Sequence, residues 1–261
     1  MATHGVEFAD VSFTVGGRSV LRNVSLRVEP GTTTALLGRS GSGKTTLLRM
    51  VNALLRPTSG RVLVDGRDAA GRDVTAEDVI ALRRGIGYVI QETGLFPHLT
   101  VERNVGMALE LAGRSREVIR TRAAEMLRMV GLASESADDA ARRYPWQLSG
   151  GQRQRVGVAR ALANEPKVLL MDEPFGALDP LTRAEMQTML RELLKKTRVT
   201  TLIVTHDLDE ALYLAERVVL LDDGAVVAEM ASRDVRGAGT EGARNEAMQR
   251  YVAATHREVT A

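Results

Sequence analysis

One segment constrains the fold of this 261-residue chain more than any other, the run Gly38-Arg39-Ser40-Gly41-Ser42-Gly43-Lys44-Thr45. An apolar run over residues 34–37 precedes it, and apolar residues at helical spacing follow it over residues 47–54. Strand, loop and helix in this order are the setting of a phosphate-binding loop. Its glycines let backbone N–H groups turn toward an anion, and the following helix adds the positive end of its dipole.

In such a loop Lys44 reaches the outer phosphates, and the hydroxyl of Thr45 is a ligand of Mg²⁺. A Gly/Ser-rich loop that matches by chance is the alternative, which the flanking strand and helix disfavour. We therefore expect this chain to bind a nucleoside triphosphate with Mg²⁺. The expected binding residues are Gly38, Arg39, Ser40, Gly41, Ser42, Gly43, Lys44, Thr45 and Thr46.

Composition narrows the possible partners. The 35 basic and 33 acidic side chains leave a formal charge of +2, too little to indicate a nucleic-acid partner. Without cysteine the chain forms no disulfide and no Cys-ligated zinc site. The amino terminus lacks the basic start and apolar stretch of a secretion signal, and no segment approaches the ~18 apolar residues of a membrane span. We expect the chain not to cross a membrane by itself.

Apolar periodicity predicts an α/β fold. The opening third is β-rich, with strands expected over residues 6–15, 20–28, 34–37 and 61–66. Later apolar runs alternate with helical patterns, which favours a parallel-rich central sheet. Strands are expected over residues 85–90, 167–171, 200–205, 218–221 and 226–228. Helices are expected over residues 101–112, 118–130, 151–163, 180–196 and 208–215, with a polar surface connection over 133–143 and Leu181 facing inward.

A second motif, Asp172-Glu173, ends the apolar run over residues 168–171. A carboxylate there lies at the carboxyl edge of the sheet, where ligands bind in α/β folds. Asp172 would hold Mg²⁺ directly or through water, and Glu173 would polarise a water for attack on the γ-phosphate. Two exposed acids at a strand end are a common alternative, which the preceding phosphate loop makes less favourable.

A third motif, Leu148-Ser149-Gly150-Gly151-Gln152, contains a serine and two glycines at the start of a helix. Such a start is a second anion-binding amino terminus. An ordinary glycine-containing loop is the alternative reading of Ser-Gly-Gly alone. Two phosphate-binding helix starts in one small chain make sense if two chains share their nucleotides.

With these motifs in this order, the chain resembles the ATP-binding subunit of an ABC transporter over roughly residues 6–230. The resemblance implies the ABC ATPase fold, with an N-terminal antiparallel β part and an inserted helical subdomain. It assigns residues 38–45 to the Walker A loop, Gln91 to the Q-loop, residues 148–152 to the signature, Asp172 to Walker B, Glu173 to the catalytic carboxylate, residues 177–179 to the D-loop and His206 to the switch histidine.

The resemblance also implies roles and partners. Glu173, His206 and Gln91 would be catalytic, and Thr45, Gln91 and Asp172 would hold Mg²⁺. Two subunits would pair head to tail as a homodimer or pseudo-dimer. The γ-phosphate held by Lys44 of one chain would then meet the signature of its mate. Ser149, Gly150, Gly151, Gln152 and Asp179 would thus complete the ATP site.

An ABC ATPase domain is expected over residues 1–232, with its core in 1–91 and 166–232 and its helical subdomain in 92–165. Residues 233–261 would be a tail without a regulatory domain. Residues 85–91, 94–98 and 143–145 most resemble the glycine betaine/osmoprotectant (quaternary amine) uptake branch, with polyamine, phosphate or other anion importers as alternatives.

The expected partners of such an importer are integral membrane permease subunits and a periplasmic or lipid-anchored solute-binding protein. Residues 94–98 would lie where the permease docks, at the cytoplasmic face of the membrane. A non-transport ABC ATPase acting on nucleic acid or ribosomes is a competing reading, as is a small-molecule P-loop kinase. No second cassette, coiled-coil insertion or strongly basic composition supports the former.

One departure from the family pattern generates a prediction. The aromatic residue that stacks on adenine should fall at Val15, and valine cannot stack on a base. Phe13, on the same side of the strand, is a partial substitute. We expect ATP and GTP to be hydrolysed at comparable rates in a steady-state phosphate-release assay. A GTP rate far below the ATP rate would contradict this.

Overall fold

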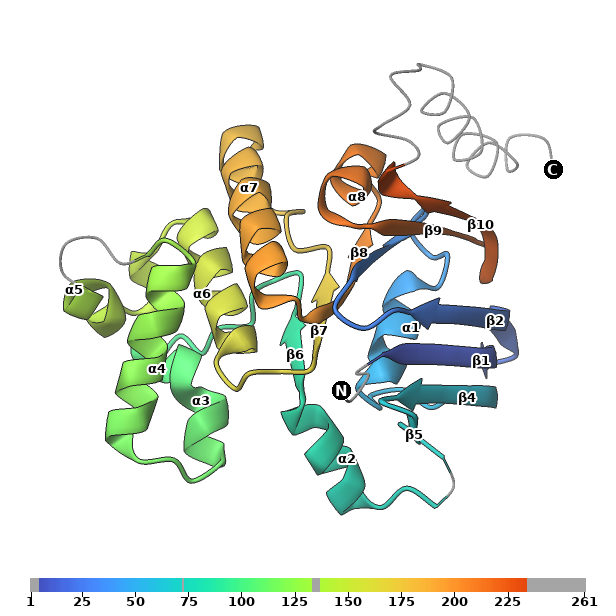
Figure 1. Ribbon diagram of the computed structural model, residues 1–261, viewed down its shortest axis with the longest axis horizontal. Helices are drawn as coiled ribbons and strands as arrows, with labels where there is room; N and C mark the ends of the chain where they lie inside the picture. Colours follow the sequence, from blue (N-terminus) through green and yellow to red (C-terminus); the bar gives the residue numbers. More distant parts are fainter. Residues whose placement is uncertain (1–4, 72, 133–136, 234–261) are drawn as a thin grey trace. The chain divides into compact units, whose positions relative to one another are not determined.

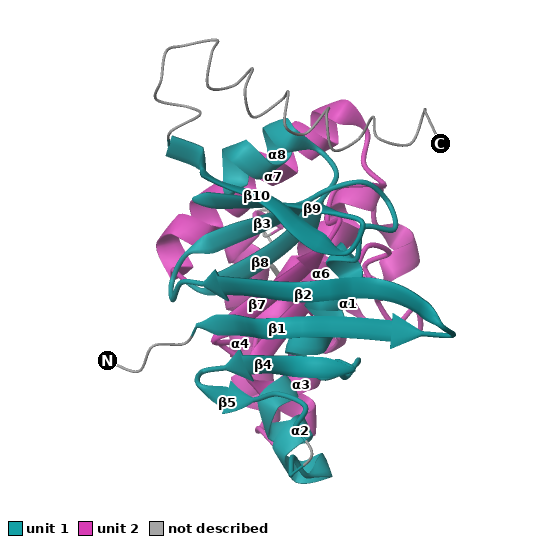
Figure 2. Ribbon diagram, turned by 90° about the vertical axis from the view of Figure 1, so that its right-hand side faces the viewer, with its two compact units in different colours: residues 1–83, 199–261 teal, residues 84–198 magenta. Residues whose placement is uncertain are grey.

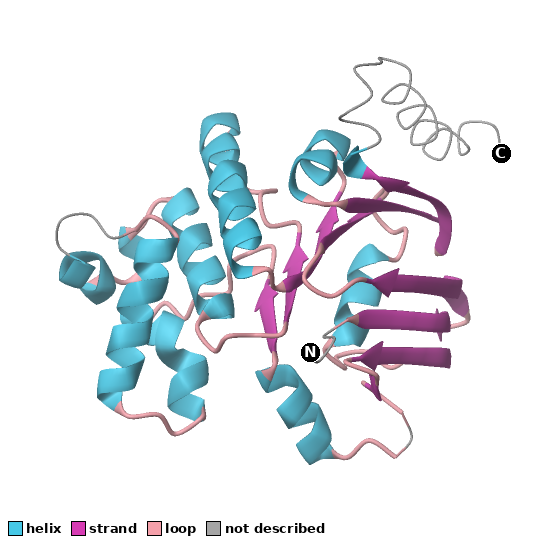
Figure 3. Cartoon of the chain, in the orientation of Figure 1, coloured by secondary structure: helices cyan, strands magenta, loops and turns pink. Residues whose placement is uncertain are grey.

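The computed structural model describes residues 5–71, 73–132 and 137–233. Contacts within the chain divide it into two compact units (Figure 2). The first unit comprises residues 1–83 and 199–261, and the second comprises residues 84–198. Both combine strands with helices, so the predicted α/β class is confirmed (Figure 3).

An antiparallel sheet opens the first unit, as predicted. Strand β1 (Val6–Val15) pairs with β2 (Arg18–Val28) on one side and β4 (Ser59–Val64) on the other. The short β5 (Arg67–Asp68), which the sequence pattern does not predict, continues the sheet beside β4 (Figure 1). In β1 the side chains of Val6 and Phe8 are buried because alternation places them on one face, and an irregularity in the pairing between Phe8 and Val11 shifts the phase so that Val11 is buried as well.

The first unit also contains parallel strands. Strand β3 (Thr33–Leu37) lies between β8 (Thr200–Thr205) and β9 (Arg217–Asp222) and is parallel to both. The antiparallel β10 (Ala225–Ala231) follows at the edge of β9. Every residue of β3 and β8 is buried, which explains their continuous apolar runs, since parallel strands are covered on both faces.

The first unit's helices are α1 (Lys44–Val51), α2 (Ala76–Arg84) and α8 (Leu208–Leu214). Helix α2 is not predicted by the apolar pattern, because none of its residues is buried. It is attached instead by Arg83, whose guanidinium donates to the carbonyls of Asn52 and Ala53, at 3.0 Å each. The expectation that Leu54 continues the buried side of α1 is wrong, because the helix ends at Val51 and Leu54 is 51% exposed.

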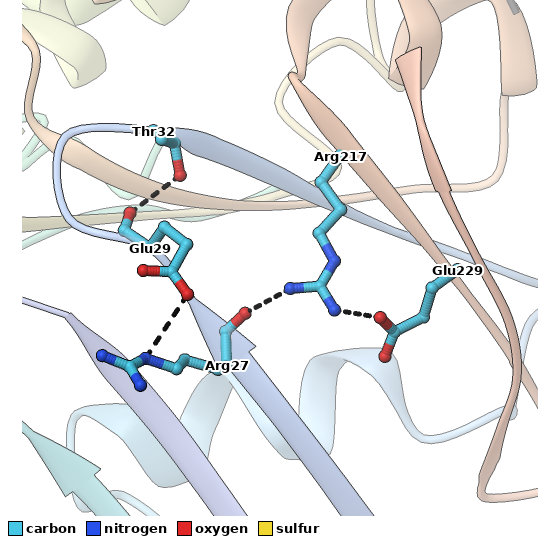
Figure 4. A network of polar contacts seen from close by, with 5 residues as sticks. All are labelled: Arg27, Glu29, Thr32, Arg217 and Glu229. Atoms are coloured by element: carbon cyan, nitrogen blue, oxygen red, sulfur yellow. Dashed lines mark hydrogen bonds and ion pairs between the residues drawn. The ribbon is translucent and has the colours of Figure 1, made fainter. Parts of the chain in front are cut away.

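A polar network ties β2, β9 and β10 together near their junction (Figure 4). Arg217 donates to the carbonyl of Arg27 at 2.8 Å and forms an ion pair with Glu229. Nearby, the Thr32 hydroxyl donates to the carbonyl of Glu29 at 2.7 Å. Glu29, Thr32 and Arg217 also line a cavity of about 800 Å³. Because β3 and β9 begin here, this cavity lies at the amino ends of the parallel strands, opposite the edge where α/β folds bind ligands.

The second unit pairs two parallel strands, β6 (Ile86–Val89) and β7 (Val168–Asp172). Its helices are α3 (Val101–Leu111), α4 (Arg116–Met129), α5 (Ala137–Arg142), α6 (Gly150–Leu162) and α7 (Pro180–Thr197), with a 3₁₀ turn at Pro145–Gln147. Helices α3, α4 and α6 pack on one another through buried apolar side chains such as Val105, Met126 and Val156. Across the described ranges of the chain, no helix has the length and hydropathy needed to span a bilayer.

Two expectations about the second unit need correction. Residues 133–143 were expected to be a surface connection, but residues 137–142 form α5, while residues 133–136 lie outside the described part. Leu181 was expected to face inward, and it is 73% exposed. The reason is helical phase, because Met186 and Leu190 set the buried face of α7 and Leu181 lies about 140° around the helix from Met186.

This difference in burial predicts a difference in stability. Leu190→Ala should lower the free energy of unfolding by about 2–5 kcal/mol, because it removes buried methyl groups and leaves a cavity. Leu181→Ala, on the same helix, should stay within about 0.5 kcal/mol of the parent. Denaturant unfolding followed by circular dichroism measures both. Equal losses in the two variants would show that the buried face of α7 is assigned wrongly.

Candidate functional site

The phosphate loop lies between β3 and α1 in the first unit. Gly43 is the N-cap of α1 with φ of 98°, and Gly41 has φ of 83°, both in the left-handed region that favours glycine. A Cβ at Gly43 would lie 2.6 Å from Cδ2 of Leu21, so a side chain does not fit. The backbone therefore approaches the start of the helix without side chains in the way, as a phosphate cradle requires.

Lys44 and Ser42 line this loop. Lys44 is only 5% exposed, and its ammonium donates to the carbonyls of Gly38 and Arg39 at 2.8 and 2.6 Å. The hydroxyl of Ser42 is buried and has no hydrogen-bond partner among the residues that the structure describes. Thr45 and Thr46 occupy the first turn of α1, whose N–H groups have no partner within the helix. A ligand with several phosphate oxygens fits this concentration of donors.

His206 is placed at the same edge of the first unit. It follows β8 directly, and the register of β8 on β3 pairs Thr205 with Leu37, the residue before Gly38. The imidazole is exposed, and Asp207 begins α8 by accepting from the N–H of Glu210 at 3.1 Å. Within the first unit, the start of the phosphate loop and the predicted switch histidine thus lie at adjacent strand ends.

In the second unit the carboxyl ends of β6 and β7 bring Gln91, Asp172 and Glu173 to one edge. The strands pair Val89 with Met171, so the polar residues follow at matching positions. A Cβ built on Gly176 would lie 3.7 Å from Nε2 of Gln91 and 3.8 Å from Oε2 of Glu173. The side chains of Gln91 and Glu173 therefore lie beside the same glycine.

The two acidic residues differ in surroundings. Asp172 is the last residue of β7 and is buried, whereas Glu173 is partly exposed. Glu173 has φ of 44°, a left-handed conformation that is uncommon for residues with a Cβ and that concentrates at functional sites. Within residues 5–71, 73–132 and 137–233, no group of three or more acidic or histidine side chains forms a metal cage.

The signature residues lie at the exposed amino end of α6. Ser149 and Gln152 form a capping box, in which Ser149 Oγ accepts from the N–H of Gln152 at 3.2 Å and Gln152 Oε1 accepts from the N–H of Ser149 at 3.0 Å. A Cβ at Gly151 would lie 2.4 Å from Cγ2 of Thr182, so α6 starts tightly against α7. The serine and glutamine side chains therefore have a structural role of their own, while Ser149 and Gly150 remain exposed.

Asp179 lies close to this helix start. It is the N-cap of α7 and accepts from the N–H of Thr182 at 3.0 Å. Leu178, its neighbour, lies 3.8 Å from the Cβ position of Gly150. Hydrogen bonds from the Thr182 side chain and backbone lower the pKa of Asp179, which keeps this exposed carboxylate ionised.

Three residues that the sequence analysis does not single out contact this part of the second unit. Gly176 lies beside the side chains of Gln91 and Glu173. Arg160 donates to the backbone carbonyls of residues 93 and 94, and Asn104 bonds to backbone groups of Phe96, Leu99 and Thr100. Arg160 and Asn104 act on backbone groups, and Gly176 has no side chain. No pattern of residue types in the sequence therefore identifies these three residues.

A glycine cradle before a helix, on parallel strands that end in carboxylates, defines the class of P-loop nucleoside triphosphate-binding proteins. Residues 21–176 match the family described as ABC transporter. The chain belongs to the ABC transporter family.

Relatives and solved structures agree with this assignment. The chain is 44% identical over 212 residues to the choline transport ATP-binding protein OpuBA of Bacillus subtilis, covering 81% of this chain and 53% of that protein. It is 46% identical to the glycine betaine uptake system ATP-binding protein YehX of Escherichia coli, covering 85% of this chain and 69% of that protein. The dimeric post-hydrolysis structure of the ATP-binding cassette MJ0796 bound to ADP and Pi is 37% identical, with a TM-score of 0.76, covering 87% of this chain and 99% of that one. The chain spans about half the length of the first of these relatives.

The capping role of Asp179 predicts a pH dependence of stability. Because its pKa in the folded chain lies below the ordinary value of 3.8, its contribution is present above that value and is lost as pH falls through the folded pKa. Asp179→Asn keeps a capping oxygen but does not titrate. The difference in Tm between the parent and Asp179→Asn should therefore shrink as pH falls below the ordinary value of 3.8 in thermal melts. A difference that does not change with pH would contradict the cap.

Proposed function

We propose that this chain hydrolyses ATP to ADP and phosphate as the ATP-binding subunit of an ABC importer. The observation that carries the proposal is the phosphate loop, in which left-handed glycines, a buried Lys44 and an unsatisfied Ser42 hydroxyl surround the start of α1. Family membership supports the reaction, and the carboxyl edge of β6 and β7 supplies groups that can perform it.

The residues of the phosphate loop bind the triphosphate. Backbone N–H groups of the loop and first turn of α1 donate to phosphate oxygens, and Lys44 adds a positive charge. Thr45, Gln91 and Asp172 supply the hydroxyl, amide and carboxylate oxygens that suit Mg²⁺. When bound, Mg²⁺ neutralises charge on the phosphates.

Glu173 acts as the general base. Its carboxylate accepts a proton from water as the water oxygen bonds to the γ-phosphorus and the bond to the bridging oxygen of ADP breaks. Gln91, beside the same glycine, orients that water, and His206 contacts the γ-phosphate. Partial exposure of Glu173 keeps its carboxylate reachable by water.

The signature residues serve a second copy of the chain. Ser149, Gly150, Gly151, Gln152 and Asp179 complete the ATP site of the partner subunit. The exposed amino end of α6 supports this, because Ser149 and Gly150 are exposed and the capping box of Ser149 and Gln152 holds the turn in place. The dimeric cassette MJ0796 is a precedent for such pairing.

Permease subunits of the membrane are the second kind of partner, and a solute-binding protein is the third. Residues 94–98 are the proposed contact with the permease, and Phe96 there is 41% exposed and lies edge-on to His98. The subunit would sit peripherally at the cytoplasmic face of the membrane. No nucleic-acid partner is proposed.

The proposed solute is glycine betaine or a related quaternary amine, supported by the names of OpuBA and YehX. Another small solute, such as a polyamine, phosphate or other anion, is the alternative. Uptake of radiolabelled glycine betaine by cells with and without this gene distinguishes them. Loss of glycine betaine uptake on deletion of the gene supports the proposal. Unchanged glycine betaine uptake, together with loss of uptake of a polyamine, phosphate or other anion, supports the alternative.

Glu173→Gln tests the reaction. The amide is nearly isosteric but does not accept the proton, so hydrolysis should fall by about 10²- to 10⁴-fold while ATP binding persists. Phosphate release measures the rate, and size-exclusion chromatography with MgATP should show a trapped dimer. Lys44→Ala is the control, since it should lose binding and dimerisation together. Normal hydrolysis by Glu173→Gln would remove Glu173 from the mechanism.

A further inference from the structure

Helix α6 contacts the segment that follows Gln91. The guanidinium of Arg160, near the carboxyl end of α6, donates to the carbonyls of Thr93 and Gly94, at 2.6 Å each. One turn earlier, Gly157 lies close enough that a Cβ there would be 3.8 Å from the carbonyl oxygen of Thr93. Two points on one face of α6 thus hold the chain two to three residues after Gln91.

This clamp holds a backbone that would not otherwise keep its shape. Thr93 and Gly94 both have φ of 55°, in the left-handed region, which glycine adopts readily but which, for a β-branched residue such as Thr93, persists only where its surroundings determine it. Short charge-assisted bonds from a planar guanidinium provide this, because its two N–H groups match two neighbouring carbonyls. Burial lowers the pKa of Arg160 from its ordinary value, yet a guanidinium stays protonated at neutral pH.

A separate side chain holds the rest of the loop. Asn104, fully buried on α3, accepts from the N–H of Phe96 and donates to the carbonyls of Phe96, Leu99 and Thr100, at 2.8 to 3.1 Å. Residues 96–100 are therefore held by a side chain of α3, whereas residues 93–94 are held by a side chain of α6. In the chain, Gln91 lies between the end of β6 and the two residues that Arg160 holds. The bonds of Arg160 therefore limit how far Gln91 can move relative to α6.

The signature residues and Arg160 lie at opposite ends of α6. Its first turn contains the signature residues, and Arg160 lies 11 residues beyond Ser149, about 16 Å along the helix. We propose that Arg160 is a positioning residue for ATP hydrolysis, which ties Gln91 to α6 and so makes the place of Gln91 beside Glu173 depend on the position of the signature helix. This inference rests on the proposed function and adds a residue to it.

Steady-state ATP hydrolysis by the full chain tests the proposal in Arg160→Ala, Arg160→Lys, Gln91→Ala and the Gln91→Ala/Arg160→Ala double variant. Arg160→Ala should lower kcat by about 10- to 100-fold and change KM for MgATP much less, because a displaced Gln91 misorients water while the phosphate loop and Lys44 still bind the triphosphate. Arg160→Lys should recover only part of kcat, since an ammonium cannot pair with both carbonyls. In the Gln91→Ala background, Arg160→Ala should lower kcat less than twofold further, because residues that act as a unit are not additive.

Arg122 provides a matched control. Its guanidinium also donates to two carbonyls near the end of α6, those of Ala163 and Leu162 at 3.0 and 3.5 Å, and its ion pairs are with Glu125 and Glu165. Arg122→Ala should keep kcat within twofold of the parent. The proposal is overturned if Arg160→Ala behaves like Arg122→Ala, or if the effects of Arg160→Ala and Gln91→Ala multiply.

Two further readouts separate failure of this inference from other failures. If Arg160→Ala does not fold, as a thermal melt would reveal, Arg160→Lys decides, and a kcat equal to that of the parent overturns the proposal. Failure of the inference alone leaves the loss of hydrolysis in Glu173→Gln intact. Failure of the proposed function appears instead as hydrolysis that does not depend on Glu173.

Discussion

Complete burial of short parallel strands is the constraint on which this structure depends. Strands β3, β7 and β8 are buried along their whole length, so polar groups that must meet a ligand are placed at their ends. In the first unit β3 leads into the phosphate loop, and β8 leads into His206. In the second unit β7 ends in Asp172, followed by Glu173. Both units thus place their polar groups at or just after the last residue of a buried strand, because burial disfavours charge farther inside the strand.

A second feature that both units share is a helix start that could donate N–H groups to an anion. Helix α1 begins at Gly43, which has no side chain to cap the helix, whereas α6 begins at Ser149 with a complete capping box. The difference is physical. A loop that wraps around phosphate needs its innermost N–H groups uncovered. The start of α6 keeps its own cap, in which Ser149 Oγ accepts from the N–H of Gln152, while Ser149 and Gly150 remain exposed.

How far the sequence predicted these features depends on the kind of signal. Strands with continuous or alternating apolar residues, such as β1 and β3, were predicted within a few residues, because burial on one or both faces leaves a period. The sequence pattern does not predict helices α2 and α5, because neither segment has a clear stripe of apolar residues at helical spacing. Leu181 was assigned to the wrong face of α7. An apolar pattern predicts that a residue lies in a helix more reliably than it predicts which face a residue in the first turn occupies.

The sequence by itself determined the chemistry: the phosphate loop, the strand-end carboxylates and the order of motifs that defines the family, since each depends on residue types at short spacing. Only the tertiary structure decided which groups act together within a unit. It brought the side chains of Gln91 and Glu173 beside Gly176, and it tied residues 93–94 to Arg160, which is more than 60 residues away in the chain. Contacts between a side chain and distant backbone carbonyls leave no trace in residue type, because every residue has a carbonyl.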